Sequence, residues 1–318
     1  MKSSLVFENL SVGYDSKSIV NQINVEVKTN HFIAILGKNG VGKSTLLNTI
    51  LGIEKPLEGS IYLNHKDIKD YQPNEIAKEI AVVFSKMEQV PNIKVKDLIK
   101  IGKQPKSYFF DDETISDELI KISQQTSIEN LLDRDANRLS EGQLQLVMIA
   151  RALYQNTPII LMDEPTANLD LGNQYKIFDL VNSLKNQTNK TFIMATHEVD
   201  LALQFADEIW WIENEKLFCG LPESLAFEHK ILSKLSEEKL FFDEEQQLFT
   251  VHSIFNKSVK VVGNNELSFW LKKALNKHAY KIDSSCKKEI IVEDFTIKYQ
   301  DKSYQSIDEF INYFIENE

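Results

Sequence analysis

A glycine-rich loop between a strand pattern and a helix pattern constrains this chain more than any other segment. His31–Leu36 is a short, almost wholly apolar run that predicts a buried strand, and Ser44–Leu51 continues with helical periodicity. The residues between them, Gly37 to Thr45, match the pattern G-x-x-x-x-G-K-S/T in full. Because this pattern requires a strand before it and a helix after it, the segment predicts a phosphate loop in a mostly parallel α/β domain.

The loop supplies several groups that suit nucleotide phosphates. Its glycines let backbone N–H groups wrap the phosphates, and the helix N-terminus adds partial positive charge. We expect Lys43 to reach the β and γ phosphates of ATP, Ser44 to ligate Mg²⁺ and Thr45 to contact the α phosphate. The residues expected to bind the nucleotide here are Gly37, Asn39, Gly40, Gly42, Lys43, Ser44 and Thr45.

Two later strand patterns end at ionisable side chains. One apolar run ends at Asp163 and Glu164, and the predicted strand Thr191–Ala195 is followed shortly by His197. Asp163 is suited to hold Mg²⁺, Glu164 to accept a proton from an attacking water, and His197 to contact the γ phosphate. Together with Lys43, Glu164 and His197 are the catalytic candidates.

Between the loop and the acidic pair lies the sequence Leu139–Gln143, which reads Leu-Ser-Glu-Gly-Gln. A Ser-x-Gly-Gln turn that opens a helix suggests a second phosphate contact, supplied by another subunit. Ser140, Gly142 and Gln143 are therefore candidates for contacting ATP, and the order of the motifs predicts a dimer with ATP at its seam.

The remaining pattern predicts two domains. Strands are expected at Ile80–Phe84, Pro158–Met162 and Thr191–Ala195, with helices between them. Residues from about 86 to 156 lack strong strand signals, and Val95–Gly102 and Asp117–Ile122 look helical, which predicts a helical subdomain inserted into the sheet domain. We place the first domain at residues 1–245.

Residues 246–318 differ from the first domain in their sequence pattern, and they predict a small separate α/β domain. The segment shows a strand at Ser258–Val262, a helix that contains Trp270, an extended stretch at Glu289–Tyr299, and a final helix opened by Ser306 and Glu309 as a capping box. Sensing of a substrate or of cell state, stabilisation of a dimer, and a passive extension all remain open as roles for this domain.

Charge and composition exclude several classes of function. The chain has 318 residues, with 36 Lys and Arg against 47 Asp and Glu, and the net charge of −11 argues against nucleic acid as the main partner. Cys219 and Cys286 form no close pair, which favours a reducing intracellular compartment over a disulfide framework. No apolar stretch approaches the roughly 18 residues of a membrane span, and the start turns polar too early for a signal sequence.

Taken together, these motifs resemble those of ATP-binding cassette (ABC) ATPases over roughly residues 4 to 225. The matching elements are the phosphate loop, the Leu139–Gln143 signature, the acidic strand end with the following Pro165–Asp170, and His197. The resemblance implies that Tyr14 stacks on adenine, that Ser140 and Gly142 contact the γ phosphate held by the opposite subunit, and that Asp170 communicates across a homodimer.

Within that family, Val95–Pro105 resembles the Val-x-Glu-Leu-Val-x-x-Gly-Arg-x-Pro stretch of importer ATPases for iron-siderophore, haem and cobalamin. The segments His197–Leu201 and Gly220–Glu223 are similar to theirs as well. The resemblance implies a peripheral subunit at the cytoplasmic face of the inner (plasma) membrane. Its implied partners are an integral membrane permease and, through the permease, a substrate-binding protein.

One position departs from the family pattern. A glutamine usually follows the strand equivalent to Ile80–Phe84, where it touches Mg²⁺ or the attacking water and links the site to the permease, but Ser85 stands there in this chain. A serine hydroxyl is shorter, so either Ser85 acts through a bridging water or Glu88 or Gln89 replaces the glutamine. The departure bears on coupling to the permease and not on ATP binding.

The sequence thus predicts an ATP-hydrolysing subunit that powers a membrane importer for iron-siderophore, haem or cobalamin. Two alternatives stay open. One is a soluble ABC ATPase with a role outside transport, for example in iron-sulfur assembly, and the other is a regulatory module that binds ATP without appreciable hydrolysis.

Overall fold

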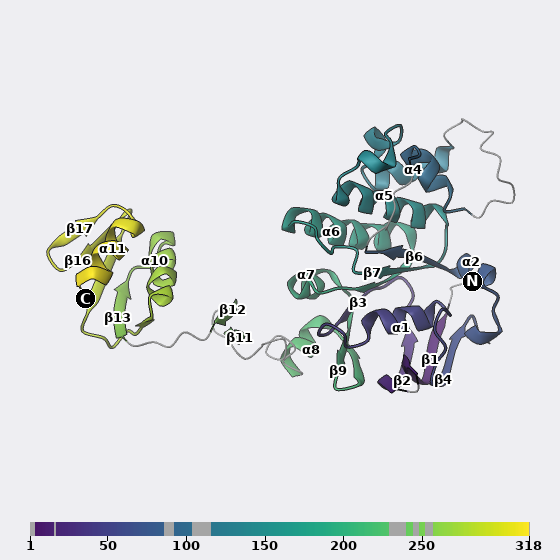
Figure 1. Cartoon of the computed structure of the whole chain (residues 1–318), viewed down its shortest axis with the longest axis horizontal. Coiled ribbons are helices and arrows are strands. Elements are labelled where there is room, and N and C mark those ends of the chain that lie inside the picture. Colours follow the sequence, from purple (N-terminus) through teal and green to yellow (C-terminus); the bar gives the residue numbers. More distant parts are fainter. Residues whose placement is uncertain are drawn as a thin grey trace. The chain divides into compact units, whose positions relative to one another are not determined.

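The computed structural model describes residues 4–15, 17–85, 92–103, 116–228, 240–243, 248–251 and 257–317. Contacts divide the chain into two compact units, residues 1–235 and 236–318, where the sequence suggested a boundary at 245. Both units combine helices and strands (Figure 1), and the α/β fold class is confirmed. Within the described residues, no helix is both long enough and apolar enough to cross a membrane.

A six-stranded sheet forms the centre of the first unit. Its strand order is β10-β9-β3-β8-β7-β6, and all neighbours are parallel except the β10–β9 pair. The strands are β3 (Phe32–Leu36), β6 (Ile80–Phe84), β7 (Ile159–Asp163), β8 (Thr191–Ala195), β9 (Glu208–Glu213) and β10 (Lys216–Gly220). Strands β6, β7 and β8 lie where the sequence predicted the strands that lead to Ser85, Asp163 and His197.

Both faces of this sheet are buried, which explains why its parallel strands are continuously apolar. Phe32, Ala34 and Leu36 of β3 pack into the core shared with the helical subdomain, while Ile33 and Ile35 pack on the other side. Parallel strands end at the same edge of a sheet. The loops after β3, β7 and β8 therefore meet there.

A second, four-stranded sheet with the order β2-β1-β4-β5 covers the other side of α1 (Lys43–Ile50). Its strands are β1 (Leu5–Tyr14), β2 (Lys17–Val27), β4 (Glu58–Leu63) and β5 (Lys66–Asp67). Leu5 and Phe7 of β1 are buried on either side of the less buried Val6, but residues 10–13 are buried in a row where the pairing with β2 is irregular. This layer has no counterpart among the strands predicted from the sequence.

The other helices of the first unit lie on the opposite side of the six-stranded sheet or at its edges (Figure 1). The helical subdomain contains α3 (Val95–Lys100), α4 (Asp117–Gln125), α5 (Glu141–Tyr154) and the short 3-10 turns Glu129–Leu131 and Ala136–Arg138. The remaining helices are α2 (Pro73–Glu79), preceded by the 3-10 turn Ile68–Asp70, α6 (Leu171–Thr188), α7 (Val199–Phe205) and α8 (Pro222–Glu228).

The second unit contains a five-stranded sheet with the order β14-β13-β15-β16-β17. Its elements are β13 (Lys257–Val262), α10 (Glu266–Lys277), β14 (Tyr280–Ile282), β15 (Glu289–Glu293), β16 (Thr296–Tyr299), β17 (Lys302–Tyr304) and α11 (Ile307–Asn317). A separate hairpin, β11 (Leu240–Asp243) and β12 (Leu248–Val251), precedes it.

The predicted cap of the final helix forms only in part. Ser306 Oγ accepts from Glu309 N–H at 3.2 Å, but the Glu309 carboxylate accepts from Gln305 N–H instead of from Ser306.

Candidate active site at the carboxyl ends of β3, β7 and β8

The phosphate loop opens α1 with a helix end that no side chain caps. Gly42 is the N-cap residue at φ 111°, and the first turn of α1 contains no acidic residue. A Cβ at Gly40, where φ is +73°, would meet no atom within 4 Å, so the backbone there faces open space. Free N–H groups at a helix N-terminus beside an open glycine cradle suit a phosphate group.

Lys43 is held inside this loop. Its side chain is 5% exposed, and Nζ donates to the carbonyl oxygens of Gly37 at 3.1 Å and of Lys38 at 3.4 Å. Nζ also lies 3.2 Å from His197 Nε2. Burial lowers the pKa of Lys43, and the charge of Glu164 opposes that shift. A buried ammonium held mainly by carbonyl oxygens can exchange them for phosphate oxygens.

Ser44 and Asp163 form a direct pair between α1 and the end of β7. Ser44 Oγ donates to Asp163 Oδ1 at 3.0 Å, and burial raises the pKa of Asp163 despite that bond. The described residues contain no group of three or more His, Cys, Asp or Glu side chains that could hold a metal. A hydroxyl and one carboxylate nevertheless fit Mg²⁺, which retains several waters and takes few protein ligands beside substrate phosphates.

Glu164 and His197 meet across neighbouring strands. His197 Nε2 lies 2.6 Å from Glu164 Oε1, and both side chains are partly exposed, at 40% and 31%. Glu164 has φ +48°, a left-handed conformation that is uncommon for a residue other than glycine, and its N–H donates to Ala195 O on β8. The structure therefore brings together Lys43 and His197, which were predicted separately, with the acidic pair.

Tyr14, at the end of β1, lies beside the same loop. Thr45 Oγ1 donates to the Tyr14 hydroxyl at 3.1 Å, and the Tyr14 side chain is 42% exposed while Thr45 is buried. An exposed aromatic ring fixed next to a phosphate loop offers a flat surface for a base.

The signature residues lie at the N-terminus of α5, and Asp170 lies at the N-terminus of α6. Ser140 and Gln143 cap α5 reciprocally: Ser140 Oγ accepts from Gln143 N–H, and Gln143 Oε1 accepts from Ser140 N–H. Asp170 caps α6, accepting from Asn173 N–H at 3.0 Å and from Asn173 Nδ2 at 2.7 Å. A Cβ at Gly142 would lie 3.2 Å from Asn173 Cγ, so Asn173 joins the two caps.

Sequence analysis did not single out Asn173. Its only signal there is its spacing, three residues after a capping aspartate, and that spacing is common at helix starts.

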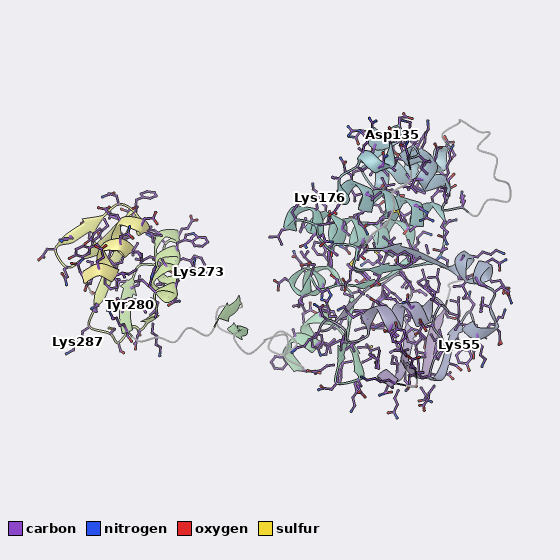
Figure 2. All side chains as sticks on the ribbon, in the orientation of Figure 1. Lys55, Asp135, Lys176, Lys273, Tyr280 and Lys287 are labelled. Carbon is purple, nitrogen blue, oxygen red and sulfur yellow. The ribbon has the colours of Figure 1, made fainter. Side chains whose placement is uncertain are left out.

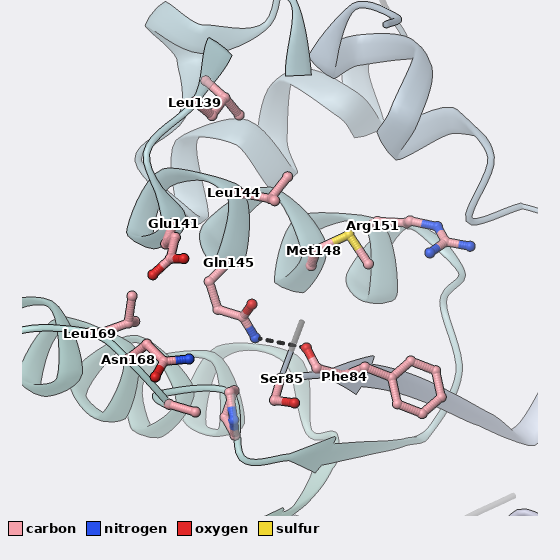
Figure 3. A pocket seen from close by; sticks show the side chains of 12 residues that line it. Phe84, Ser85, Leu139, Glu141, Leu144, Gln145, Met148, Arg151, Asn168 and Leu169 are labelled. Atoms are coloured by element: carbon pink, nitrogen blue, oxygen red, sulfur yellow. Dashed lines mark hydrogen bonds between the residues drawn. The ribbon is translucent and has the colours of Figure 1, made fainter. Parts of the chain in front are cut away.

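Ser85 lines a separate cavity of about 260 Å³ between the end of β6 and α5 (Figure 3). Its lining includes Phe84, Leu144, Met148 and Leu169, and Phe84 is 46% exposed. Gln145 Nε2 donates to Phe84 O at 3.3 Å, which ties the signature helix to the residue before Ser85 (Figure 3). The suggested substitutes Glu88 and Gln89 lie outside the described residues, as do the last two residues of the Val95–Pro105 stretch.

The fold and the site define a phosphate-loop ATPase with a helical subdomain. The signature residues of that subdomain cap the N-terminus of α5. The family model described as ABC transporter matches residues 20–167. An uncharacterized ABC transporter ATP-binding protein of Methanocaldococcus jannaschii is 36% identical over 235 residues, covering 73% of this chain and 81% of that protein. The chain therefore belongs to the ABC transporter ATP-binding proteins and is an ABC-type ATPase that binds ATP, as the sequence predicted.

Two further similarities agree with this assignment. The ferric enterobactin transport ATP-binding protein of Escherichia coli is 32% identical over 221 residues, covering 69% of this chain and 82% of that protein. The structure of cbiO1 from Clostridium perfringens, part of the ABC transporter complex cbiONQ, has a TM-score of 0.63 and 28% identity, covering 73% of this chain and 93% of that one.

Proposed function

We propose that this protein is the ATP-hydrolysing subunit of a membrane importer, working as a homodimer with ATP at its seam. The observation that carries the proposal is the junction at the ends of β3, β7 and β8, where Lys43, Ser44, Asp163, Glu164 and His197 are linked by contacts of 2.6 to 3.2 Å. Each of these side chains has a distinct task in phosphoryl transfer to water.

Within this junction, the backbone of Gly37, Asn39, Gly40 and Gly42 surrounds the phosphates. Lys43 exchanges its carbonyl partners for β and γ oxygens, and Tyr14 stacks on adenine. Ser44 and Asp163 would hold Mg²⁺, which when bound would supply positive charge opposite the phosphates. Ser85, directly after the adjacent strand β6, would contact this ion through a bridging water.

Glu164 is the general base. Its carboxylate stands at the strand end beside the phosphate loop and accepts the proton of the attacking water, while His197 orients that carboxylate and contacts the γ phosphate. The second phosphate contact comes from Ser140, Gly142 and Gln143 of the opposite subunit. The positive end of α5 suits that contact, although its capping box already occupies the N–H groups of Ser140 and Gln143.

The cavity beside Ser85 is the proposed contact for an integral membrane permease. Phe84 is exposed at its rim, and Arg151 lines it with Nε unpartnered among the described residues. Partial burial lowers the pKa of Arg151, and a carboxylate from a partner would pair with this half-buried cation. The lining is mostly apolar but includes Glu141 as well as Arg151. Such a hollow fits a short permease segment that places an apolar side chain in it and an acidic residue near Arg151.

The proposed location is the cytoplasmic face of the inner membrane, where the subunit binds peripherally through that permease. A substrate-binding protein would engage the permease and not this chain. The similarity to a ferric enterobactin transport protein supports an iron-siderophore as cargo, with haem or cobalamin as the related choices.

Substitution of Glu164 by Gln tests the assigned base. We expect steady-state ATP hydrolysis to fall by about 10² to 10⁴-fold because the water loses its proton acceptor, while ATP binding persists and a dimer accumulates. Glu129→Gln, at an exposed position in the helical subdomain, is the matched control and keeps normal turnover. Normal hydrolysis by the Glu164 variant would refute the assignment.

Copurification separates transport from the soluble alternative. The tagged full-length chain, extracted from membranes in mild detergent, should bring down an integral membrane protein, and Arg151→Ala should weaken that association. Recovery with soluble partners alone would contradict the transport role while leaving the ATPase assignment intact.

A further inference from the structure

The turn that carries His197 joins a fully buried strand to a helix that is only partly buried. Every residue of β8 is buried, whereas Ala202 is the single buried residue of α7. The ring of His197 contacts Glu164 at 2.6 Å and Lys43 at 3.2 Å, and it has no further hydrogen-bond partner in the described parts of the chain. The place of the ring therefore depends on the backbone turn that carries it.

Glu198, next to His197, is the N-cap residue of α7 but does not use its carboxylate as a cap. Glutamate is not among the side chains that favour this position. Its Oε1 atom instead accepts from Gln174 Nε2 at 2.9 Å. Glu198 N–H donates to Thr196 Oγ1 at 3.1 Å, and Val199 N–H donates to His197 O at 3.0 Å, so residues 196–199 form one tight turn. The bond from Gln174 ties this turn to α6.

Gln174 reaches Glu198 from the inner face of α6. The residue is 8% exposed and shares this face with Phe178, one turn further on, whereas Lys176 is on the exposed face (Figure 2). Helix α6 contacts α7 on the same side of the six-stranded sheet (Figure 1). Gln174 N–H donates to Asp170 O at 2.9 Å, so the tie to the turn starts from the capped first turn of α6.

The amide of Gln174 is not the side chain that stability alone would favour. Its Oε1 atom is buried and has no hydrogen-bond partner among the residues that the structure describes. A buried polar atom without a partner costs stability, and leucine, which is similar in size, would fill this place without that cost. Glu198 does not depend on the bond either, because it is partly exposed and its carboxylate can bind water. The effect of the bond is to fix the turn that carries His197 relative to α6.

We propose that Gln174 is a positioning residue for ATP hydrolysis, which holds the 196–199 turn through Glu198 where His197 reaches both Glu164 and Lys43. This inference rests on the proposed role of His197. Displacing a reacting group by about 1 Å costs up to about 100-fold in rate. The turn keeps its internal hydrogen bonds when the tie to α6 is lost, so we expect a smaller loss, of about 10-fold.

Steady-state ATP hydrolysis and urea denaturation of Gln174→Leu in the full-length chain test the proposal. We expect kcat to fall about 10-fold and the KM for ATP to change less than about 2-fold, because the phosphate loop is untouched. The urea midpoint should stay the same or rise, since the buried atom without a partner is gone. Gln187→Leu makes the same change at an exposed position of α6, where the amide pairs with Gln125, and should keep native kcat. A lower urea midpoint with normal kcat would show a merely structural role and overturn the proposal.

Glu198 gives a second test that does not depend on a buried substitution. Burial raises the pKa of Glu198 and His197 opposes that shift, so a direct effect of the carboxylate charge on the imidazole is the alternative explanation. Glu198→Ala removes the acceptor and should lower kcat as much as Gln174→Leu does. Glu198→Gln keeps an acceptor oxygen without the charge and should retain at least about half of native kcat. Equal losses in these two Glu198 variants would assign the effect to charge and refute the positioning role.

A double-mutant cycle shows whether Gln174 acts through His197. Adding Gln174→Leu to His197→Ala should lower kcat by less than about 2-fold further, because the group that Gln174 positions is already absent. A full further loss of about 10-fold would contradict the proposal. Normal kcat in His197→Ala alone would refute the proposed role of His197 and this inference with it. Normal kcat in Gln174→Leu beside an impaired His197→Ala would refute this inference alone.

Discussion

Replacement of two glycines of the phosphate loop should separate the stability of the loop from its ability to bind ATP. Gly42 has φ +111°, and a Cβ there would lie 2.6 Å from Ile19 Cγ2 and 3.3 Å from Val20 Cγ2 on β2. Gly40 has φ +73°, and its Cβ would point into open space. Alanine at either position meets backbone strain, but only alanine at Gly42 also collides with a neighbouring strand.

The two costs can be estimated from this geometry. Backbone strain at a positive φ costs about 1 to 2 kcal/mol for alanine, and displacing a packed β-branched side chain costs about 1 to 3 kcal/mol more. Gly42→Ala should therefore lower the free energy of unfolding by about 2 to 5 kcal/mol, and Gly40→Ala by about 1 to 2 kcal/mol. For ATP affinity the order should reverse. Relative to the stability that each variant loses, Gly40→Ala should weaken ATP binding more than Gly42→Ala, because the methyl group of the Gly40 variant fills the space expected to receive phosphate.

Urea denaturation of the nucleotide-free variants measures the first quantity, and isothermal titration calorimetry with ATP measures the second. Equal losses of stability in both variants would show that Ile19 moves without cost. Unchanged ATP affinity in the Gly40 variant would show that phosphate does not approach that glycine, and either result would refute the reasoning.

Two more variants probe the site. Burial raises the pKa of Asp163, so ionisation of this carboxyl disfavours the folded state. The native protein should therefore lose stability relative to Asp163→Asn as pH rises above the ordinary aspartate pKa of about 3.9. Urea midpoints that shift in the opposite direction with pH would contradict this. Asp163→Asn should also abolish Mg²⁺-dependent hydrolysis. Gln145→Leu removes the donor to Phe84 O and should cost about 1 kcal/mol of stability, with a larger loss in permease-stimulated than in basal hydrolysis. Equal losses in the two hydrolysis assays would argue against a coupling role.

The sequence by itself predicted the class of ATPase and the local parts of its candidate site. The phosphate loop and the strand end at Asp163 are local patterns, in which a buried apolar run stops at a glycine turn or at a charged pair, and such patterns report backbone conformation and burial directly. The cap of α5 by Ser140 and Gln143 is equally local, since both partners lie within one helical turn.

Only the tertiary structure decided which separated residues meet. The 2.6 Å contact between Glu164 and His197 depends on the register of β7 against β8, and the place of Asn173 beside Gly142 depends on how two helices approach. The antiparallel layer formed by β1 and β4 likewise pairs segments far apart in the chain. Contacts of this kind arise from packing between segments, which no local pattern encodes. The core that α10 and α11 share in the second unit is likewise set by packing between segments.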